Sequence, residues 1–254
     1  MSQTPATRLA PHPPLKAYYC GEEDRRQWVL GLFNRTAADY DRVERVMAFG
    51  TGSWYRRRAL QRAGLSSGMT VLDIGVGTGL VAREAAVLCG DPTRVTGVDP
   101  SAGMVENAKV PPGVQLVAGS AELIPVASAS ADFLSMGYAL RHVSDLSVAF
   151  REFHRVLKPG GRLCLLEITR PEGAWSQSVL KGYMRVMVPL AARLVARHRD
   201  TPELMRYYWD TIEACASPRV ILEALSAAGF VEVNRRVELG VFSEYRARKP
   251  DLAG

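Results

Sequence analysis

The sequence lacks the patterns that mark membrane-spanning, secreted and zinc-binding chains. None of its apolar stretches reaches the ~18 charge-free residues that a transmembrane helix needs. Its N-terminus has no apolar core of the kind found in signal peptides, so we expect a cytoplasmic protein. Its 4 cysteines lie far apart and form no C-x-x-C pair, which argues against a zinc site or a disulfide framework. We therefore expect no bound metal.

Negative charge is also in short supply. The 254 residues include 32 Lys and Arg but only 26 Asp and Glu, which gives a net charge of +6. A basic chain can bind nucleic acid or an anionic membrane surface. The arginines are spread along the whole chain, however, and aromatic residues that could stack on bases are not interleaved with them. We therefore expect no nucleic-acid partner.

The N-terminal part of the chain reads as a tail followed by helices. Residues 1–20 are rich in proline and polar side chains, which predicts a loose tail. Residues 21–62 have a helical pattern of apolar positions, which Gly50-Thr51-Gly52 interrupts. We expect residues 21–254 to form one domain.

The middle of the chain alternates short apolar runs with helical patterns. The runs predict five strands, at residues 70–74, 95–99, 114–117, 131–136 and 162–168. The segments between them predict helices at residues 81–89, 104–109 and 146–157. Buried strands that alternate with helices indicate parallel βαβ units.

The C-terminal part departs from this alternation. Residues 171–215 are a mostly helical insertion, in which Pro189 should kink or break a helix. A helix at 220–228 follows, and then two strands, at 230–237 and 241–248, joined by a turn at Gly240. The sequence thus predicts an α/β fold with a doubly wound, mostly parallel seven-stranded sheet whose last strand is antiparallel.

The strongest chemical signal is the glycine loop at residues 71–79, VLDIGVGTG. A strand ends there, Gly75, Gly77 and Gly79 turn the chain, and a helix begins, so that free N–H groups face a ligand. Dinucleotide sites space their glycines G-x-G-x-x-G, whereas this loop reads G-x-G-x-G. The spacing favours a cofactor without a pyrophosphate and disfavours a nucleotide-dependent oxidoreductase. A glycine turn that binds no ligand is the alternative.

Asp99 is the second signal, because it ends the second predicted strand. An acidic residue there can accept both ribose hydroxyls of an adenosine. The position suits a nicotinamide or an adenosylmethionine cofactor, and the simpler alternative is a cap for the next helix. Its distance from the glycine loop favours the cofactor.

With these motifs the chain resembles class I S-adenosylmethionine-dependent methyltransferases. More narrowly, it resembles the ubiquinone/menaquinone-biosynthesis C-methyltransferase family over about residues 33–248. The segments that carry the resemblance are residues 33–41, 47–50, 54–57, 119–125, 139–143, 155–163 and 166–171. Three positions depart from the family pattern, namely Glu44, Leu80 and His142. Glu44 and His142 stand where substrate would lie, which leaves room for a different acceptor.

The resemblance implies a Rossmann-like methyltransferase fold, with residues 21–62 as a lid and residues 171–215 as a cap. It also implies S-adenosyl-L-methionine as the cofactor and S-adenosyl-L-homocysteine as the product. The cofactor-binding residues that it implies are Tyr40, Gly75, Gly77, Thr78, Gly79, Asp99, Pro100, Met104, Ser120, Ala121 and Gly137.

Two residues at the end of the fourth predicted strand are the catalytic candidates. Arg141 carries a fixed cation that can stabilise a phenolate, or it can be the partner of a surface salt bridge. His142 has a reference pKa near 6.5, which suits proton transfer, although a structural role is as plausible. The implied reaction is C-methylation of a quinol or related phenol.

Other functions stay open at this stage. The chain could methylate O or N of another metabolite or lipid, or hold the cofactor as a non-catalytic subunit. Apolar residues and arginines alternate in the insertion, for example Leu190, Arg193 and Leu194. They could lie on an anionic membrane, roof a greasy substrate or simply cover the core. We expect a hydrophobic aromatic acceptor, weak peripheral membrane contact and a capacity to form a homodimer.

Overall fold

A single seven-stranded sheet organises the computed structural model, which describes residues 8–251. The strand order is β3-β2-β1-β4-β5-β7-β6. The strands are β1 (Val71–Ile74), β2 (Val95–Asp99), β3 (Gln115–Ala118), β4 (Ala131–Gly137), β5 (Leu157–Ile168), β6 (Val231–Glu238) and β7 (Phe242–Arg248). Strands β1 to β5 pair in parallel, and β7 is antiparallel to both of its neighbours. The predicted fold class is therefore confirmed.

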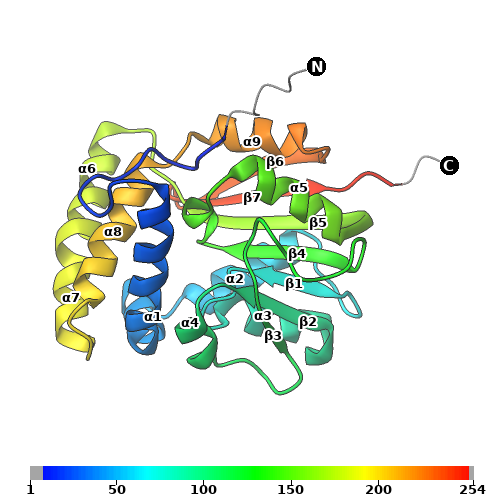
Figure 1. Ribbon diagram of the computed structural model, residues 1–254, viewed down its shortest axis with the longest axis horizontal. Helices are drawn as coiled ribbons and strands as arrows, with labels where there is room; N and C mark the ends of the chain where they lie inside the picture. Colours follow the sequence, from blue (N-terminus) through cyan, green and yellow to red (C-terminus); the bar gives the residue numbers. More distant parts are fainter. Residues whose placement is uncertain (1–7, 252–254) are drawn as a thin grey trace.

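Helices cover both faces of this sheet (Figure 1). They are α2 (Gly52–Arg62), α3 (Leu80–Cys89), α5 (Leu146–Val156) and α9 (Pro218–Ala227). Helix α1 (Glu22–Met47) lies instead at one end of the sheet, in contact with the short α4 (Ala102–Glu106) (Figure 1). Successive residues of β1 point to opposite faces. Leu72 packs in the cluster that holds α5 and α9, whereas Val71 packs in the cluster that holds α2 and α3. Burial on both faces explains the unbroken apolar runs of the central strands.

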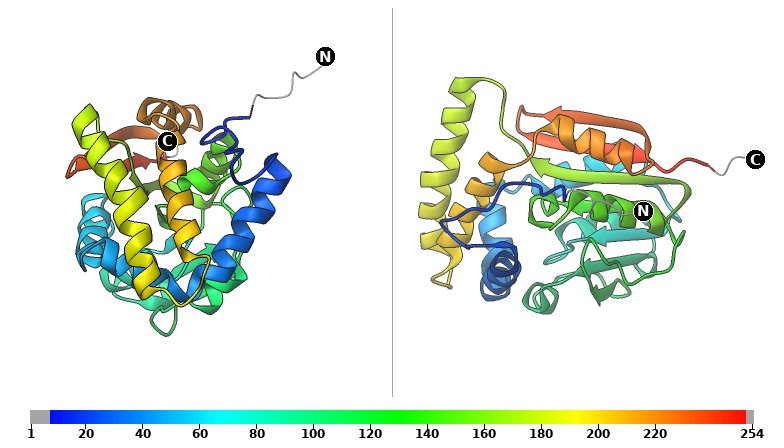
Figure 2. Two further views of the ribbon diagram at one scale, coloured as in Figure 1. Left: turned by 90° about the vertical axis from the view of Figure 1, so that its left-hand side faces the viewer. Right: turned by 45° about the horizontal axis from the view of Figure 1, so that its top comes forward.

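The insertion adds α6 (Ala174–Gly182), α7 (Val188–Val195) and α8 (Thr201–Ala214). Figure 2 shows α1, α7 and α8 side by side across one end of the sheet. They share a third core cluster that includes Leu32, Met184, Tyr207 and Trp209. This group of helices stands at the end of the sheet where the parallel strands finish.

The predicted break at Pro189 takes a milder form. Pro189 lies in the first turn of α7, and a π-helical turn, Tyr183–Met187, precedes it. A proline has no N–H to give to the helix, and a wider turn accommodates that loss without ending the helix. α6 and α7 therefore continue one another through a π-helical turn, and Pro189 does not break the helix.

Residues 8–20 also differ from the expected loose tail. The carbonyl of Leu9 accepts the N–H of Leu146 at 2.9 Å, and that of Pro11 accepts the N–H of Ala216 at 2.7 Å. His12 and Tyr19 are buried. This segment binds the body through backbone carbonyls, which proline retains. The remaining tail residues, 1–7, lie outside the described part of the chain.

Two element boundaries were predicted less well. β5 begins at Leu157, five positions before the predicted Arg162, because Leu157 already pairs with Ala131 across a register shift. α4 is short and begins at Ala102, because Ser101 caps it by accepting the Met104 N–H at 3.1 Å. Within residues 8–251, no helix is long and apolar enough to cross a membrane.

Candidate active site

A cavity of about 360 Å³ lies where β1, β2 and β4 end. In doubly wound sheets ligands bind at this edge, where the strand order reverses, and here the reversal lies between β1 and β4. The volume falls within the range of small-molecule sites, ~300–1,000 Å³. Helices α1 and α8 form the opposite wall, through residues such as Phe33, Tyr40 and Tyr208.

Most of the residues that the sequence singles out line this one cavity. They are Tyr40, Gly75, Gly77, Thr78, Asp99, Pro100, Met104, Ser120, Ala121, Gly137 and His142. Two do not line it, namely Gly79 and Arg141. Gly79 instead precedes α3 with a φ of 86°, and a Cβ there would collide with Val110. Its role is therefore to turn the chain.

The glycine loop is built from backbone that side chains would obstruct. Gly75 and Gly77 have φ angles of 66° and 55°, in the left-handed region that glycine tolerates. A Cβ on Gly75 would lie 2.7 Å from the Cβ of Ala139. At Gly77 the nearest atom to a Cβ is 4.0 Å away, so the loop there is open toward the cavity. A ligand can approach this backbone closely.

Asp99 holds the loop and still has capacity to accept hydrogen bonds. Its Oδ2 accepts the N–H of Gly77 at 2.8 Å, and its Oδ1 accepts the N–H of Ser101 at 2.8 Å. Burial raises the pKa of its carboxyl, and the N–H groups of Ser101 and Gly77 oppose that shift. A carboxylate has about four lone-pair sites, so two remain for ribose hydroxyls. The helix cap belongs to Ser101, not to Asp99.

Helix α1 is fastened to the body on both sides of the cavity. The side-chain oxygen of Asn34 accepts hydrogen bonds from Ser101 Oγ at 2.6 Å and from Gly103 N–H at 3.0 Å. Closer to the C-terminus of α1, Asp41 accepts a hydrogen bond from the hydroxyl of Thr78 in the glycine loop at 2.5 Å. The helix therefore covers the cavity in a fixed position. By contrast, α2 packs on α3 and forms part of the body.

Arg56, on α2, is a cavity residue that the sequence reasoning missed. Its side chain is 3% exposed, and its Nη1 donates to Glu44 Oε1 at 2.7 Å. Its Nε has no hydrogen-bond partner in the described structure. The signal in the sequence was Glu44, which departs from the family pattern and supplies a countercharge to this buried arginine. The site therefore contains a buried cation whose hydrogen-bonding capacity is not used up by Glu44.

Arg141 is sealed behind the cavity wall. It is fully buried, and its Nη1 donates to Glu167 Oε2 in an ion pair. Its Nε donates to Thr211 Oγ1 at 3.1 Å, and its guanidinium carbon lies 4.5 Å from the ring centroid of Tyr208. A surface salt bridge is thus the wrong description of this ion pair. Direct contact between Arg141 and an acceptor is equally excluded in this arrangement.

His142 faces the cavity from within a box of aromatic rings. Its ring stacks on Tyr207 with centroids 5.6 Å apart, and meets Phe33 and Tyr208 edge-on at 5.1 and 5.8 Å. Neither ring nitrogen has a hydrogen-bond partner among the described residues. Burial, and then the charges of Arg141 and Arg25, lower its pKa well below the usual value. The imidazole is therefore neutral near neutral pH.

The sequence reasoning also missed Tyr208, in α8. Its hydroxyl lies 2.5 Å from the hydroxyl of Tyr40, and both side chains line the cavity. This pair closes the end of the cavity that Phe33 and His142 flank. The local sequence contains no motif that identifies Tyr208, because its preceding neighbour is also a tyrosine.

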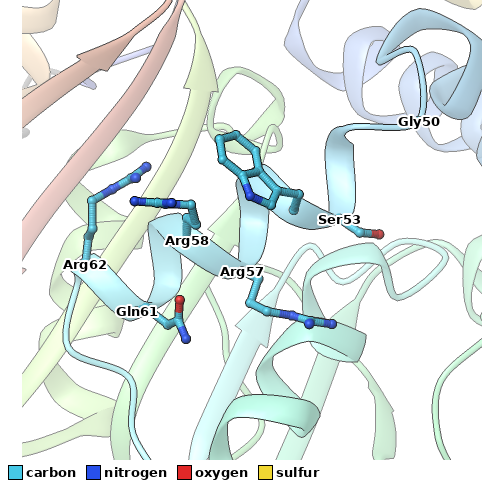
Figure 3. Close-up of a pocket in the computed structure, with 7 residues that line it drawn as sticks. Gly50, Ser53, Arg57, Arg58, Gln61 and Arg62 are labelled. Atoms are coloured by element: carbon cyan, nitrogen blue, oxygen red, sulfur yellow. The ribbon is translucent and has the colours of Figure 1, made fainter.

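A second hollow, of about 570 Å³, lies on the outside of α2 (Figure 3). Arg57, Arg58 and Arg62 line it, but Figure 3 shows Arg57 pointing away from the other two. Arg57 forms an ion pair with Glu84, and Arg62 with Glu244. The charges of Arg57 and Arg62 are therefore already paired, and the three arginines do not converge on one point (Figure 3). No cluster of metal-ligating side chains occurs anywhere in residues 8–251.

Comparison with known proteins places this site in a family. A family model described as the ubiE/COQ5 methyltransferase family matches residues 21–249. The ubiquinone/menaquinone biosynthesis C-methyltransferase UbiE of Rubrivivax gelatinosus is 36% identical over 84% of this chain and 82% of its own length. The protein of that name from Campylobacter jejuni is 29% identical over 89% of this chain and 99% of its own length.

Solved structures have the same fold at lower identity. A SAM-dependent methyltransferase from Thermotoga maritima, described as a possible histamine N-methyltransferase, has a TM-score of 0.59 at 24% identity, and the match covers 87% of this chain and 99% of that one. Phosphoethanolamine N-methyltransferase 2 of Haemonchus contortus, solved with S-adenosyl-L-methionine, has a TM-score of 0.57 at 19% identity, over 78% of this chain and 53% of that one.

Proposed function

Since the chain belongs to the ubiE/COQ5 methyltransferase family, we propose that it methylates a ring carbon of a quinol or a related phenol. It is an S-adenosylmethionine-dependent methyltransferase, and S-adenosylmethionine is its methyl donor. The proposed acceptor is supported by the composition of the far end of the cavity, which Phe33 and His142 flank. Aromatic side chains wall it, and the hydroxyls of Tyr40 and Tyr208 are its polar groups.

The described residues fit this cofactor. Asp99 would accept the ribose hydroxyls, with its carboxylate held in place by Gly77 and Ser101. Ser120 and Ala121 follow β3 beside it and would border the adenine. The open backbone of Gly77 admits the methionine portion. Arg56, which lines the cavity, would offer a guanidinium N–H to the carboxylate of that portion.

The chemistry needs an electron-rich ring carbon held in line with the methyl group. The sulfonium of the cofactor supplies an activated methyl group. The protein's contribution is therefore mainly to position the acceptor in line with that methyl group. Helix α1, fastened through Asn34 and Asp41, closes the cavity over the reacting groups. The aromatic wall of Phe33, His142 and Tyr208 would orient a flat ring.

A methyltransferase that acts on an amine is the strongest alternative. Amine acceptors are bound by carboxylates, and two glutamates line the outer part of the cavity. Glu22 already forms ion pairs with Arg8 and Arg25, and Glu122 accepts the N–H of Ser144. The far end of the cavity has aromatic walls, and this supports a phenol as the acceptor. A non-catalytic cofactor-binding subunit would show no turnover in the test that follows.

The test is methyl transfer from labelled S-adenosylmethionine to a panel of demethylated quinols, simple phenols and amines. Mass spectrometry then locates the methyl group. We expect a carbon-bound methyl on the quinols, and label on oxygen or nitrogen would refute the C-methylation proposal.

Asp99→Asn tests the cofactor site, because it keeps one side-chain oxygen but removes the charge. By calorimetry, it should weaken S-adenosylhomocysteine binding about tenfold or more, which matches the loss of one charged hydrogen bond.

We also propose weak contact with an anionic membrane through α6 and α7. A stripe of apolar side chains runs along these helices, from Trp175, which is 80% exposed, to Leu194, which is 82% exposed. Its other members are Val179, Val186, Met187 and Leu190. Exposed Arg193 and Arg197 follow on the same segment. Apolar side chains beside arginines favour the surface of an anionic bilayer.

Vesicle sedimentation tests this contact. The protein should pellet with vesicles that contain phosphatidylglycerol, and less so as the salt concentration rises. The double variant Trp175→Ser and Leu194→Ser should stay in the supernatant. Val87→Ser changes a side chain that is 58% exposed on α3, and serves as the control. Equal pelleting of all three proteins would rule out this surface, and a dimer that dissociates in the double variant would show that a second copy covers it.

A further inference from the structure

The hydroxyl pair of Tyr40 and Tyr208 joins two parts of the chain inside the cavity. Tyr40 comes from α1 and Tyr208 from α8, and their oxygens lie 2.5 Å apart. Neither hydroxyl has another hydrogen-bond partner in the described structure. Both side chains line the cavity at the end where we place the acceptor. The pair is therefore a polar feature that nothing else in the protein uses.

Counting protons shows what the pair can bind. Burial raises the pKa of both phenols, so each oxygen carries its proton at neutral pH. Each phenol is one donor and also an acceptor. One of the two O–H groups is used within the pair, and the other remains to donate to a third oxygen. A buried donor without a partner costs free energy, so a ligand oxygen at this place is favourable.

Arg141 packs against the ring of Tyr208. Its guanidinium carbon is 4.5 Å from the ring centroid, and Arg141 is fully buried and does not line the cavity, whereas Tyr208 does. A cation against the ring favours negative charge on the phenol oxygen. It opposes the effect of burial on the pKa of Tyr208, and it does so more strongly than Glu167 acts in the other direction. Arg141 therefore makes Tyr208 a stronger hydrogen-bond donor.

Resting on the proposed function, we infer that the Tyr40–Tyr208 pair binds the reacting ring oxygen of the acceptor. Tyr208 donates a hydrogen bond to this oxygen as it becomes a phenolate. Arg141 acts through Tyr208 and is a positioning residue, because it cannot touch the acceptor. A short, charge-assisted hydrogen bond of this kind stabilises the phenolate more than the neutral phenol.

The overall step balances as follows. The ring hydroxyl gives its proton to water, and the ring carbon forms a bond to the methyl carbon while the sulfur–carbon bond breaks. The same ring carbon then loses its proton to water, and the ring oxygen regains one. One methyl group is transferred and one proton is released overall. Tyr208 gains and loses no proton in this sequence.

Binding of 4-nitrophenol in the presence of S-adenosylhomocysteine tests the pair without turnover. Its phenolate absorbs visible light, so a titration gives the pKa of the bound probe. The wild type should bind the phenolate in preference, which lowers that pKa. Tyr208→Phe should reduce this preference at least about tenfold, or one pH unit. Tyr207→Phe is the matched control, because Tyr207 is buried one residue away and does not line the cavity.

A second comparison tests the route through Tyr208. The double variant Arg141→Gln and Glu167→Gln removes both buried charges together, which avoids leaving either one unpaired. Compared with the wild type, this double variant should lose part of the preference for the phenolate. In a protein that already carries Tyr208→Phe, the same two substitutions should cause no further loss. An equal loss in both backgrounds would overturn the route. S-adenosylhomocysteine binding checks that each variant is folded.

The outcomes separate this inference from the proposed function. If Tyr208→Phe methylates quinols at the wild-type rate and binds the phenolate as well, the inference is wrong and the function stands. If the wild type binds the phenolate through Tyr208 but methylates no quinol or phenol, the pair is an oxyanion site and the proposed acceptor is wrong. The role of Tyr208 as the donor requires that Tyr208→Phe weakens phenolate binding and that Tyr207→Phe does not.

Discussion

Two adjacent residues, Arg141 and His142, illustrate how surroundings decide chemistry. Both follow β4, and both carry nitrogen atoms that suit catalysis. Arg141 is fully buried beside Glu167, whereas His142 opens onto the cavity. The charge of Arg141 is one of the causes that lower the pKa of His142 well below its usual value. The charge of Arg141 therefore helps to keep the neighbouring His142 in its neutral form.

We predict that His142→Asn leaves the pH dependence of kcat/KM unchanged between about pH 6 and 9. A histidine whose pKa lies well below 6.5 is neutral throughout that range. The substitution should instead change the preference among acceptors, because it removes a ring that packs against Phe33 and Tyr208. Rates with two quinols that differ in one ring substituent measure this. A step near pH 6.5 that is present in the wild type and absent in the variant would contradict it.

At the scale of residues, the sequence predicts what local chemistry determines. Gly75, Gly77 and Asp99 follow strand ends in a recognisable order, so the cofactor end of the cavity could be predicted. Tyr207 and Tyr208 are adjacent and chemically alike, yet only Tyr208 faces the cavity. Adjacent residues of a helix point in directions about 100° apart, and only the packing of α8 selects one. Arg56 was missed for the same reason.

Among the elements, α1 and α4 pack closely against one another beside the cavity. α4 presents Gly103 to the backbone of α1, and a Cβ at that position would lie 2.7 Å from the carbonyl oxygen of Asn34. Only a glycine permits this approach. The contact also allows the Asn34 side chain to accept the Gly103 N–H. The position of the whole helix over the cavity depends on this small residue.

We predict that Gly103→Ala shifts α1 outward. Overpacking of this kind costs about 1–3 kcal/mol, and the cavity beside it should bind S-adenosylhomocysteine more weakly. Urea unfolding and calorimetry measure the two effects. Gly182→Ala is the matched control, since nothing lies within 4 Å of its Cβ and its φ is helical. There alanine should stabilise by up to about 1 kcal/mol. Equal stability of both variants would show that α1 adapts freely.

The elements themselves followed from the sequence wherever a pattern was local. β2 has the predicted bounds, because a buried apolar run between turns has clear ends. β5 begins earlier than predicted, since its pairing with Ala131 on β4 extends it through a glycine pair that reads as a turn. The π-helical turn before Pro189 was not predictable, because a proline in a helical pattern does not specify the wider turn that accommodates its missing N–H.

The whole molecule consists of a sheet-based body and a helical cover that must stay in register with it. Asp39, in α1, joins the two parts of that cover. Its Oδ2 accepts the N–H groups of Arg197 and His198 at 2.8 and 2.6 Å, in the loop between α7 and α8. It also accepts the hydroxyl of Thr201 at 3.3 Å. One buried carboxylate therefore fixes α1 to the insertion.

We predict that Asp39→Asn destabilises the protein by about 1.5–3 kcal/mol at pH 7, because charged hydrogen bonds are lost. Burial alone would raise the pKa of Asp39, but the N–H groups of His198 and Arg197 hold it below the usual value of 3.8. The carboxylate therefore stabilises the fold fully above about pH 4, and this contribution disappears as the pH falls through the lower, folded-state pKa. The difference between wild type and variant in urea unfolding should be constant from about pH 5 to 8 and shrink in more acidic solution.

Glu223→Gln is the control, because it removes an equal charge from a side chain that is 59% exposed and should change the stability little. Because α1 and α8 form the cavity wall, Asp39→Asn should also weaken S-adenosylhomocysteine binding. A difference in stability that grows toward low pH would contradict a lowered pKa for the Asp39 carboxyl.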